Sequence, residues 1–92
     1  MSLDYKQLYH QSDIENGLPL GMTEAIAKQE TGHIRDEATR NRVRSPANAY
    51  GHMQFIPATG RRYGLNTYED LIDPVKSIQA GGRYLEIGRA HV

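Results

Sequence analysis

The sequence contains no cysteine, and none of its apolar runs is long. Without cysteine the chain can form neither a disulfide nor a thiolate metal site, and catalysis by a thiol is excluded as well. No apolar stretch approaches the roughly 20 residues that a membrane-spanning helix needs, so we expect no membrane span. The first residues also lack the apolar core of a secretory signal, and we therefore expect the chain to carry no signal peptide of its own.

An excess of charge of one sign is missing too. The 92 residues hold 11 Lys and Arg against 11 Asp and Glu, which gives a formal net charge of zero. Proteins that bind nucleic acid usually show a basic patch or stripe, so we expect no nucleic-acid partner. A chain of this length can bury only a limited core, and residues 1–92 are expected to form one small domain.

The spacing of the apolar residues indicates helices joined by loops. Helices are expected over residues 4–16, 22–32 and 57–63, and from 73 toward the C-terminus. Asp73-Pro74 is a strong helix start, because aspartate caps free amides and proline tolerates the first turn. Glycine inside a helix costs roughly 1 kcal/mol against alanine, so Gly81-Gly82 predicts the close approach of another helix. No strand pattern is visible, which predicts a mainly α domain with a loop over residues 33–50.

Glu30 stands out among the acidic residues because of its position on a helix. Met22, Ile26 and Glu30 follow one another at intervals of four and therefore share one helical face. Most glutamates on helices are solvated surface residues, and this interpretation stays open. A carboxyl group held against apolar side chains instead prefers its neutral form, which is the form that a general acid needs.

Gln54 closes a second polar segment that begins at Ser45. Its amide offers both a donor and an acceptor, which suits sugar hydroxyls or acetamido groups. Gly51 would let the backbone come close to a ligand or to the helix of Glu30. The apolar residues beside Gln54 could simply fill the core, and for Phe55 we prefer this interpretation.

Two linked motifs resemble the catalytic core of the soluble lytic transglycosylases, which have a lysozyme-like fold and cleave the glycan strands of peptidoglycan. The first motif of that family ends in Glu-Ser-Gly, where this chain has Glu30-Thr31-Gly32. The second reads Ser-Pro-x-Gly-Ala-x-Gly-Leu-Met-Gln, where this chain has Ser-Pro-Ala-Asn-Ala-Tyr-Gly-His-Met-Gln over residues 45–54. The resemblance extends from about Asp4 to Leu85 and implies a mainly α, lysozyme-like fold.

The resemblance implies that Glu30 is the only catalytic carboxylate. It would protonate the glycosidic oxygen between N-acetylmuramic acid and N-acetylglucosamine, and then act as a base that closes a 1,6-anhydro ring. No second carboxylate is then needed, unlike in most glycosidases. Asp36 and Glu37 are the nearest candidates for such a pair, which would make the chain a hydrolytic muramidase. Their arginine-rich surroundings favour surface salt bridges instead.

The resemblance also implies a set of residues that bind the glycan, namely Ser45, Gly51, Met53, Gln54 and Ile56. Ile56 stands where the family often has a methionine that lines the sugar site. His52 replaces the usual leucine, either as a buried histidine or as a residue that faces the substrate. No metal or other cofactor is expected, because the four histidines show no metal-ligand spacing.

Two parts of the chain depart from the family pattern. The span from Glu30 to Gly51 is longer than in the commonest family form, which predicts a surface insertion with solvated arginines over residues 34–44. Residues 86–92 do not resemble the family, whose domain normally continues with further helices, so the lysozyme-like domain is expected to be incomplete at its C-terminus.

The substrate implied by the resemblance lies outside the cytoplasm, in the periplasm or cell wall. Without a signal peptide, the chain would be part of a larger exported protein or of a bacteriophage virion. The alternative from another class of function is a non-catalytic module that binds peptidoglycan or has a structural role. The presence of both Glu30 and Gln54 favours the enzyme.

Overall fold

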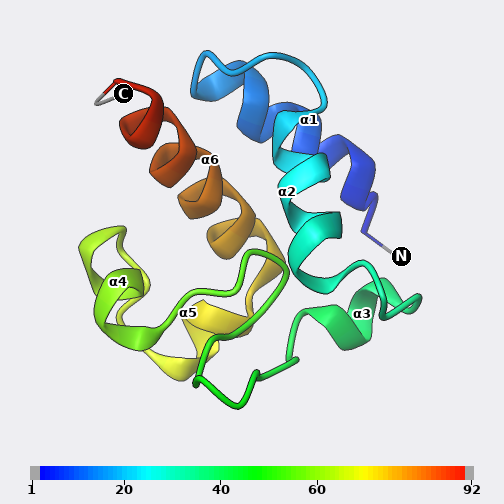
Figure 1. The fold of residues 1–92 in the computed structure, drawn as a ribbon, viewed down its shortest axis with the longest axis vertical. Coiled ribbons are helices and arrows are strands. Elements are labelled where there is room, and N and C mark those ends of the chain that lie inside the picture. The colour runs from blue at the N-terminus through cyan, green and yellow to red at the C-terminus, as the bar shows by residue number, and fades with distance from the viewer. Residues whose placement is uncertain (1–2, 91–92) are drawn as a thin grey trace.

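The computed structural model describes residues 3–90 and shows a mainly α fold. The helices are α1 (Tyr5–Glu15), α2 (Met22–Thr31), α3 (Glu37–Arg40), α4 (Pro57–Arg62), α5 (Tyr68–Ile72) and α6 (Pro74–Ala90). In Figure 1, α6 runs beside the pair formed by α1 and α2, and α4 and α5 lie at one end of α6. Within residues 3–90 there is no strand, only isolated bridges from Tyr50 to Arg44 and to Phe55. The predicted fold class is thereby confirmed.

Two clusters of buried apolar residues form the core. The first holds Tyr5, Tyr9, Ala27 and Ile78, and the second holds Phe55, Leu65, Leu71 and Ala80. Met53 packs against both clusters, so the segment between α3 and α4 joins the two halves of the core. Phe55 is buried, which confirms its predicted place in the core. Throughout the described residues, every helix is too short or too polar to cross a bilayer.

Helix α2 depends on α1 for the cap at its N-terminus. Gly21 stands at the cap position and has no side chain to offer. The buried carboxylate of Asp13 in α1 accepts hydrogen bonds from the amides of Gly21 and Thr23, at 2.8 and 2.9 Å, and from the Thr23 hydroxyl at 2.6 Å. A negative charge at a helix N-terminus satisfies the free amides and interacts favourably with the helix dipole. Asp13 thus fixes the start of the helix that carries Glu30.

Helix α6 approaches its neighbours closely at its two adjacent glycines. A Cβ atom on Gly82 would overlap the hydroxyl of Ser12 in α1 and lie 2.5 Å from Asn16 Nδ2. A Cβ atom on Gly81 would lie 2.6 Å from Cγ of Met53. The close approach predicted from this pair of glycines is therefore confirmed, with α1 on one side and the Met53 segment on the other.

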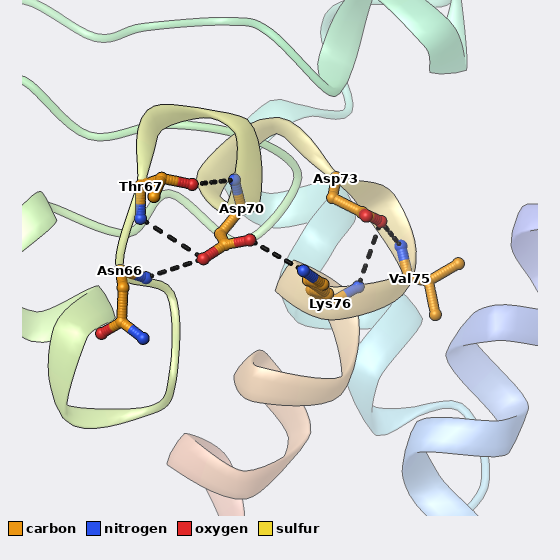
Figure 2. A network of polar contacts seen from close by, with 6 residues as sticks. All are labelled: Asn66, Thr67, Asp70, Asp73, Val75 and Lys76. Atoms are coloured by element: carbon orange, nitrogen blue, oxygen red, sulfur yellow. Dashed lines mark hydrogen bonds and ion pairs between the residues drawn. The ribbon is translucent and has the colours of Figure 1, made fainter.

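Helix α5 was not predicted, although its sequence carries a recognisable start signal. The Thr67 hydroxyl accepts a hydrogen bond from the Asp70 amide at 3.1 Å, and the Asp70 carboxylate accepts from the amides of Thr67 and Asn66 at 3.3 and 2.9 Å (Figure 2). This reciprocal arrangement is a capping box. The Lys76 ammonium lies 2.8 Å from the other Asp70 oxygen and so ties α5 to α6.

Asp73 begins α6 as predicted. Its carboxylate accepts hydrogen bonds from the amides of Val75 and Lys76, at 2.9 and 3.3 Å (Figure 2). Pro74 follows as the first residue of the helix. The helix continues through residues 86–90 of the segment predicted to be an atypical tail, and residues 91–92 of that segment lie outside the described residues.

The remaining helix predictions agree with the structure, and one loop prediction does not. The expected helices over residues 4–16, 22–32 and 57–63 correspond to α1, α2 and α4. The predicted loop over residues 33–50 was wrong for α3. This single turn forms because the Asp36 carboxylate accepts hydrogen bonds from the amide and the hydroxyl of Thr39, a local cap that apolar periodicity cannot reveal.

Candidate active site

A cleft of about 300 Å³ opens between α2, the segment before α4, and α6. It is lined by Ile26, Glu30, Met53, Gln54, Phe55, Ile56, Thr59, Gly81, Tyr84 and Leu85. The two side chains that the sequence singled out for chemistry, Glu30 and Gln54, thus come from different elements to one surface. Among the described residues that line this cleft, Glu30 is the only carboxylate.

Glu30 lies in the last turn of α2 and its side chain is exposed. Ile26, one turn earlier, lines the same cleft, in agreement with the predicted shared face. The buried face of α2 is a different one, formed by Thr23, Ala27 and Thr31. These smaller side chains turn inward toward the core, so Glu30 is open to solvent, and of the two interpretations left open by the sequence the structure shows the exposed carboxylate.

Gln54 ends a tight turn whose two sides are held together by backbone hydrogen bonds. Tyr50 and Phe55 exchange both of their bonds, at 2.8 and 3.0 Å. Gln54 itself has φ +55°, a left-handed conformation that residues other than glycine seldom adopt. Its side-chain amide donates to the Gly51 carbonyl at 2.9 Å. Within residues 3–90 the amide oxygen of Gln54 has no such partner, and it can therefore accept a hydrogen bond from a ligand.

Of the other residues predicted to bind substrate, Met53 and Ile56 line the cleft and Ser45 does not. Ile56 is 44% exposed, whereas Met53 is half-buried. The Ser45 hydroxyl accepts a hydrogen bond from the Ala49 amide at 3.1 Å. Ser45 therefore shapes the turn that leads into the site and stays outside the cleft.

Gly51 is buried and also lies outside the cleft. Its φ of +77° is a left-handed conformation that favours glycine, and a Cβ atom there would lie 3.0 Å from the Leu71 carbonyl oxygen. The close backbone approach expected at this position is therefore made to the end of α5, not to the helix of Glu30.

His52 is completely buried and does not face the cleft. The Tyr9 hydroxyl lies 2.7 Å from Nδ1, while Nε2 lies 3.0 Å from the Glu37 carbonyl oxygen and 2.8 Å from the Asn41 amide oxygen. Both partners of Nε2 are acceptors, so Nε2 carries the hydrogen and Nδ1 accepts one from Tyr9. Burial, with the nearby Arg40 charge, lowers the pKa of His52 to about 4. Of the two interpretations left open by the sequence, the buried histidine is confirmed.

Asp36 and Glu37 take no part in the cleft. Asp36 caps α3, and the backbone carbonyl of Glu37 accepts the hydrogen bond from His52. Among residues 3–90, neither carboxylate forms an ion pair with an arginine, so the salt bridges predicted for them were wrong. Arg40 departs further from the predicted solvated loop, since its side chain is buried.

Three cleft residues were not singled out by the sequence: Thr59 from α4, and Tyr84 and Leu85 from α6. A signal for Tyr84 exists, because positions 81, 84 and 85 share one helical face and the first of them contacts Met53. Across residues 3–90 no group of three or more acidic or histidine side chains could hold a metal ion.

Comparison with known proteins gives two findings. A model of the transglycosylase SLT domain family matches residues 8–89. The membrane-bound lytic murein transglycosylase F 2 of Alkalilimnicola ehrlichii is 33% identical over 81 residues. This alignment covers 88% of the chain and 16% of the relative, so the chain spans about a sixth of the length of the curated relative it matches.

Proposed function

The chain belongs to the transglycosylase SLT domain family, and on that premise we propose that it cleaves the glycan strands of peptidoglycan with Glu30 as the acid and base. The observation that carries this proposal is the cleft itself. Glu30 and Gln54, which the two family motifs contribute, line one surface, and Glu30 is the only carboxylate among the described lining residues. A glycosidase that uses two carboxylates would need a second one across the cleft.

The proposed reaction breaks the β-1,4 bond between N-acetylmuramic acid and N-acetylglucosamine. Glu30 donates its proton to the glycosidic oxygen, which leaves as the C4 hydroxyl of N-acetylglucosamine. The Glu30 carboxylate then takes the proton of the muramic C6 hydroxyl while that oxygen bonds to C1, which closes the 1,6-anhydro ring. The proton that leaves Glu30 is thus replaced, and the reaction consumes neither water nor a cofactor.

The exposure of Glu30 in the free chain is compatible with this role. A glycan strand bound in the cleft would cover the carboxyl group and take it out of water, and removal from water favours the neutral, proton-donating form of a carboxyl group. The apolar walls from Ile26, Ile56 and Leu85 would take part in excluding that water. The N-acetyl group of the substrate would help to stabilise the positive charge that develops at C1.

Gln54 is proposed to hold a sugar hydroxyl or acetamido group through its amide oxygen, which has no hydrogen-bond partner within residues 3–90. Met53 and Ile56 are proposed to contact the apolar faces of the sugar rings, since both line the cleft. Ser45 and Gly51 are proposed to act through the backbone, by fixing the loop that presents Met53 and Gln54. The periplasm or cell wall, where the substrate lies, is the proposed location of the reaction.

Product analysis tests the proposed reaction. Purified peptidoglycan is incubated with the chain, and the soluble products are identified by mass spectrometry. Muropeptides that end in 1,6-anhydromuramic acid are the expected result. New reducing ends would instead indicate a hydrolytic muramidase, and binding to peptidoglycan without any product would indicate a non-catalytic module.

A further inference from the structure

Arg40 is a buried cation that has no ion-pair partner among residues 3–90. Only 5% of the residue is exposed. Its guanidinium Nε donates to the Thr31 hydroxyl at 2.9 Å, and its Nη2 donates to the Ala27 carbonyl at 3.0 Å. A buried charge is costly without compensating contacts. Here these contacts are made at the C-terminal end of α2, where the helix dipole favours a positive charge.

Thr31 connects this contact to the segment that carries Gln54. It directly follows Glu30 and is buried. Its hydroxyl lies 3.0 Å from the Ala27 carbonyl and 3.2 Å from the His52 carbonyl. A hydroxyl has one hydrogen to donate, so it serves one of these two carbonyls at a time, and both lie within hydrogen-bond distance. The Thr31 hydrogen can therefore serve His52, which stands two residues before Gln54.

Helix α3, which carries Arg40, also holds the ring of His52. The Glu37 carbonyl and the Asn41 amide oxygen both accept from Nε2. Arg40 lies between these two residues in sequence and contacts the helix of Glu30 through Thr31 and Ala27. The α3 segment thus contacts both the end of the Glu30 helix and the segment that leads to Gln54.

We propose that Arg40 is a positioning residue that fixes Glu30 relative to Gln54 across the cleft. Its catalytic consequence rests on the function proposed above. Arginine suits this position because its planar fork donates two directed hydrogen bonds at once, whereas the lysine ammonium is a point charge on a flexible stem. The segment predicted to be a solvated insertion is, at Arg40, part of the support of the site.

The test compares Arg40→Met and Arg40→Lys with Arg42→Met, a matched control in which an exposed arginine of the same segment is replaced. All measurements are made well below the melting temperature of each variant, so that every chain is folded. If Arg40→Met does not fold, Arg40→Lys, which keeps the charge, replaces it in both measurements. Turnover of soluble glycan strands gives kcat and KM. Hydrogen exchange of backbone amides reports on the stability of the end of α2 and of the segment that carries Gln54.

With regard to turnover, Arg40→Met is expected to lower kcat by about 10- to 100-fold with little change in KM, because misplaced reacting groups cost rate more than binding. Thr31→Ser should behave like the wild-type chain since it keeps the hydroxyl. Thr31→Val should lower kcat, and the double variant Thr31→Val/Arg40→Met should lose no more than the worse single variant, as expected for two residues that act through one contact. An unchanged kcat in Arg40→Met, or additive losses, would overturn the proposal.

The exchange measurement is independent of turnover. The amides of Gly32 and Gln54, which bond to Lys28 and Gly51, should exchange faster in Arg40→Met, while the Ser77 amide of α6 should not. If the wild-type chain shows no turnover, the proposed function fails and the exchange result alone decides on Arg40. Equal exchange at Gly32 and Gln54 in Arg40→Met and Arg42→Met would then overturn the positioning role.

Discussion

The Tyr9 hydroxyl donates a hydrogen bond to Nδ1 of His52 at 2.7 Å, across 43 residues of sequence. The ring stacks on Tyr5 at a centroid distance of 5.0 Å. Burial raises the pKa of Tyr9 to about 12, so the hydroxyl keeps its proton at any neutral pH. The contact requires a neutral imidazole, because a protonated Nδ1 has no lone pair with which to accept. Helix α1 is thereby linked to the segment that leads to Gln54 by a hydrogen bond that depends on pH.

Acidification should therefore destabilise the protein. The pKa of His52 is lowered from 6.5 to about 4 in the folded chain, so between these values the unfolded chain binds more protons. The stability due to the neutral ring is fully present above pH 6.5 and is lost as the pH falls toward 4. The expected loss of unfolding free energy is about 3 kcal/mol, measured by urea denaturation across this range.

Two variants separate His52 from the other titrating groups in this experiment. His52→Leu should be less stable than the wild type at pH 7, because Tyr9 and Asn41 lose their partner, but its stability should fall less between pH 6.5 and 4. His33→Gln replaces an exposed histidine and should retain the wild-type pH dependence. If the unfolding free energy of His52→Leu fell with pH as steeply as that of the wild type, His52 would not be the titrating group.

Gly82→Ala should destabilise the protein, whereas Gly88→Ala on the same helix should not. The new methyl group at position 82 would overlap Ser12 and force α1 and α6 apart, which typically costs about 1–3 kcal/mol. At Gly88 a Cβ atom would meet nothing within 4 Å, and alanine there should stabilise the helix by up to about 1 kcal/mol. Thermal melting of both variants measures the difference. Equal effects would show that the two helices do not approach closely.

Asp13→Ala should cost more stability than removal of an exposed helix cap. It leaves the amides of Gly21 and Thr23 without their acceptor, in a part-buried and a buried position, while the Thr23 hydroxyl keeps only its contact to the Ser12 hydroxyl. We expect a loss of at least about 2 kcal/mol, since an unsatisfied buried donor costs about 1–3 kcal/mol. Asp4→Ala removes the exposed cap of α1 and should cost about 1 kcal/mol. The two values come from denaturant titrations, and a smaller loss for Asp13→Ala than for Asp4→Ala would count against its role.

Gln54 allows its backbone and its side chain to be tested separately. Gln54→Gly keeps the left-handed conformation without strain, so its stability should equal or exceed that of the wild type. Glycan binding should nevertheless weaken, because the amide is gone. Gln54→Asn retains an amide and tolerates this conformation, and should keep part of the binding. Glycan affinity and melting temperature are measured for both, and wild-type affinity in Gln54→Gly would exclude a direct contact.

Local signals in the sequence predicted most of the fold. The cap at Asp73 with Pro74 depends on residues two and three positions away, and it was found in the structure. The glycine pair in α6 predicted a close approach, which the structure shows, although the contacts are made to Ser12 and Met53, far away in the sequence. Helix α5 could have been predicted, because Thr67 and Asp70 form a capping box at the standard spacing. Helix α3 is one turn long and has no apolar period.

The candidate site was predictable only where it depends on the two motifs. Glu30 and Gln54 line the cleft together, as the resemblance implied. The exposure of Glu30 could not be decided from the sequence, because spacing gives a shared face but not which face is buried, and here the face of Ala27 and Thr31 packs inward. The buried position of Arg40 depends on contacts to residues 9 and 13 positions away, which no local pattern encodes.

Cleavage of peptidoglycan by Glu30→Gln is the most direct test of the central claim. The substitution removes the proton donor but keeps the shape, and because Glu30 is exposed the melting temperature should not change. Turnover should fall by at least about 100-fold, the usual contribution of a general acid, while glycan affinity persists. Glu37→Gln, which replaces one of the two alternative carboxylates and leaves the Asp36 cap of α3 in place, should cleave like the wild type. Wild-type turnover in folded Glu30→Gln would contradict the account.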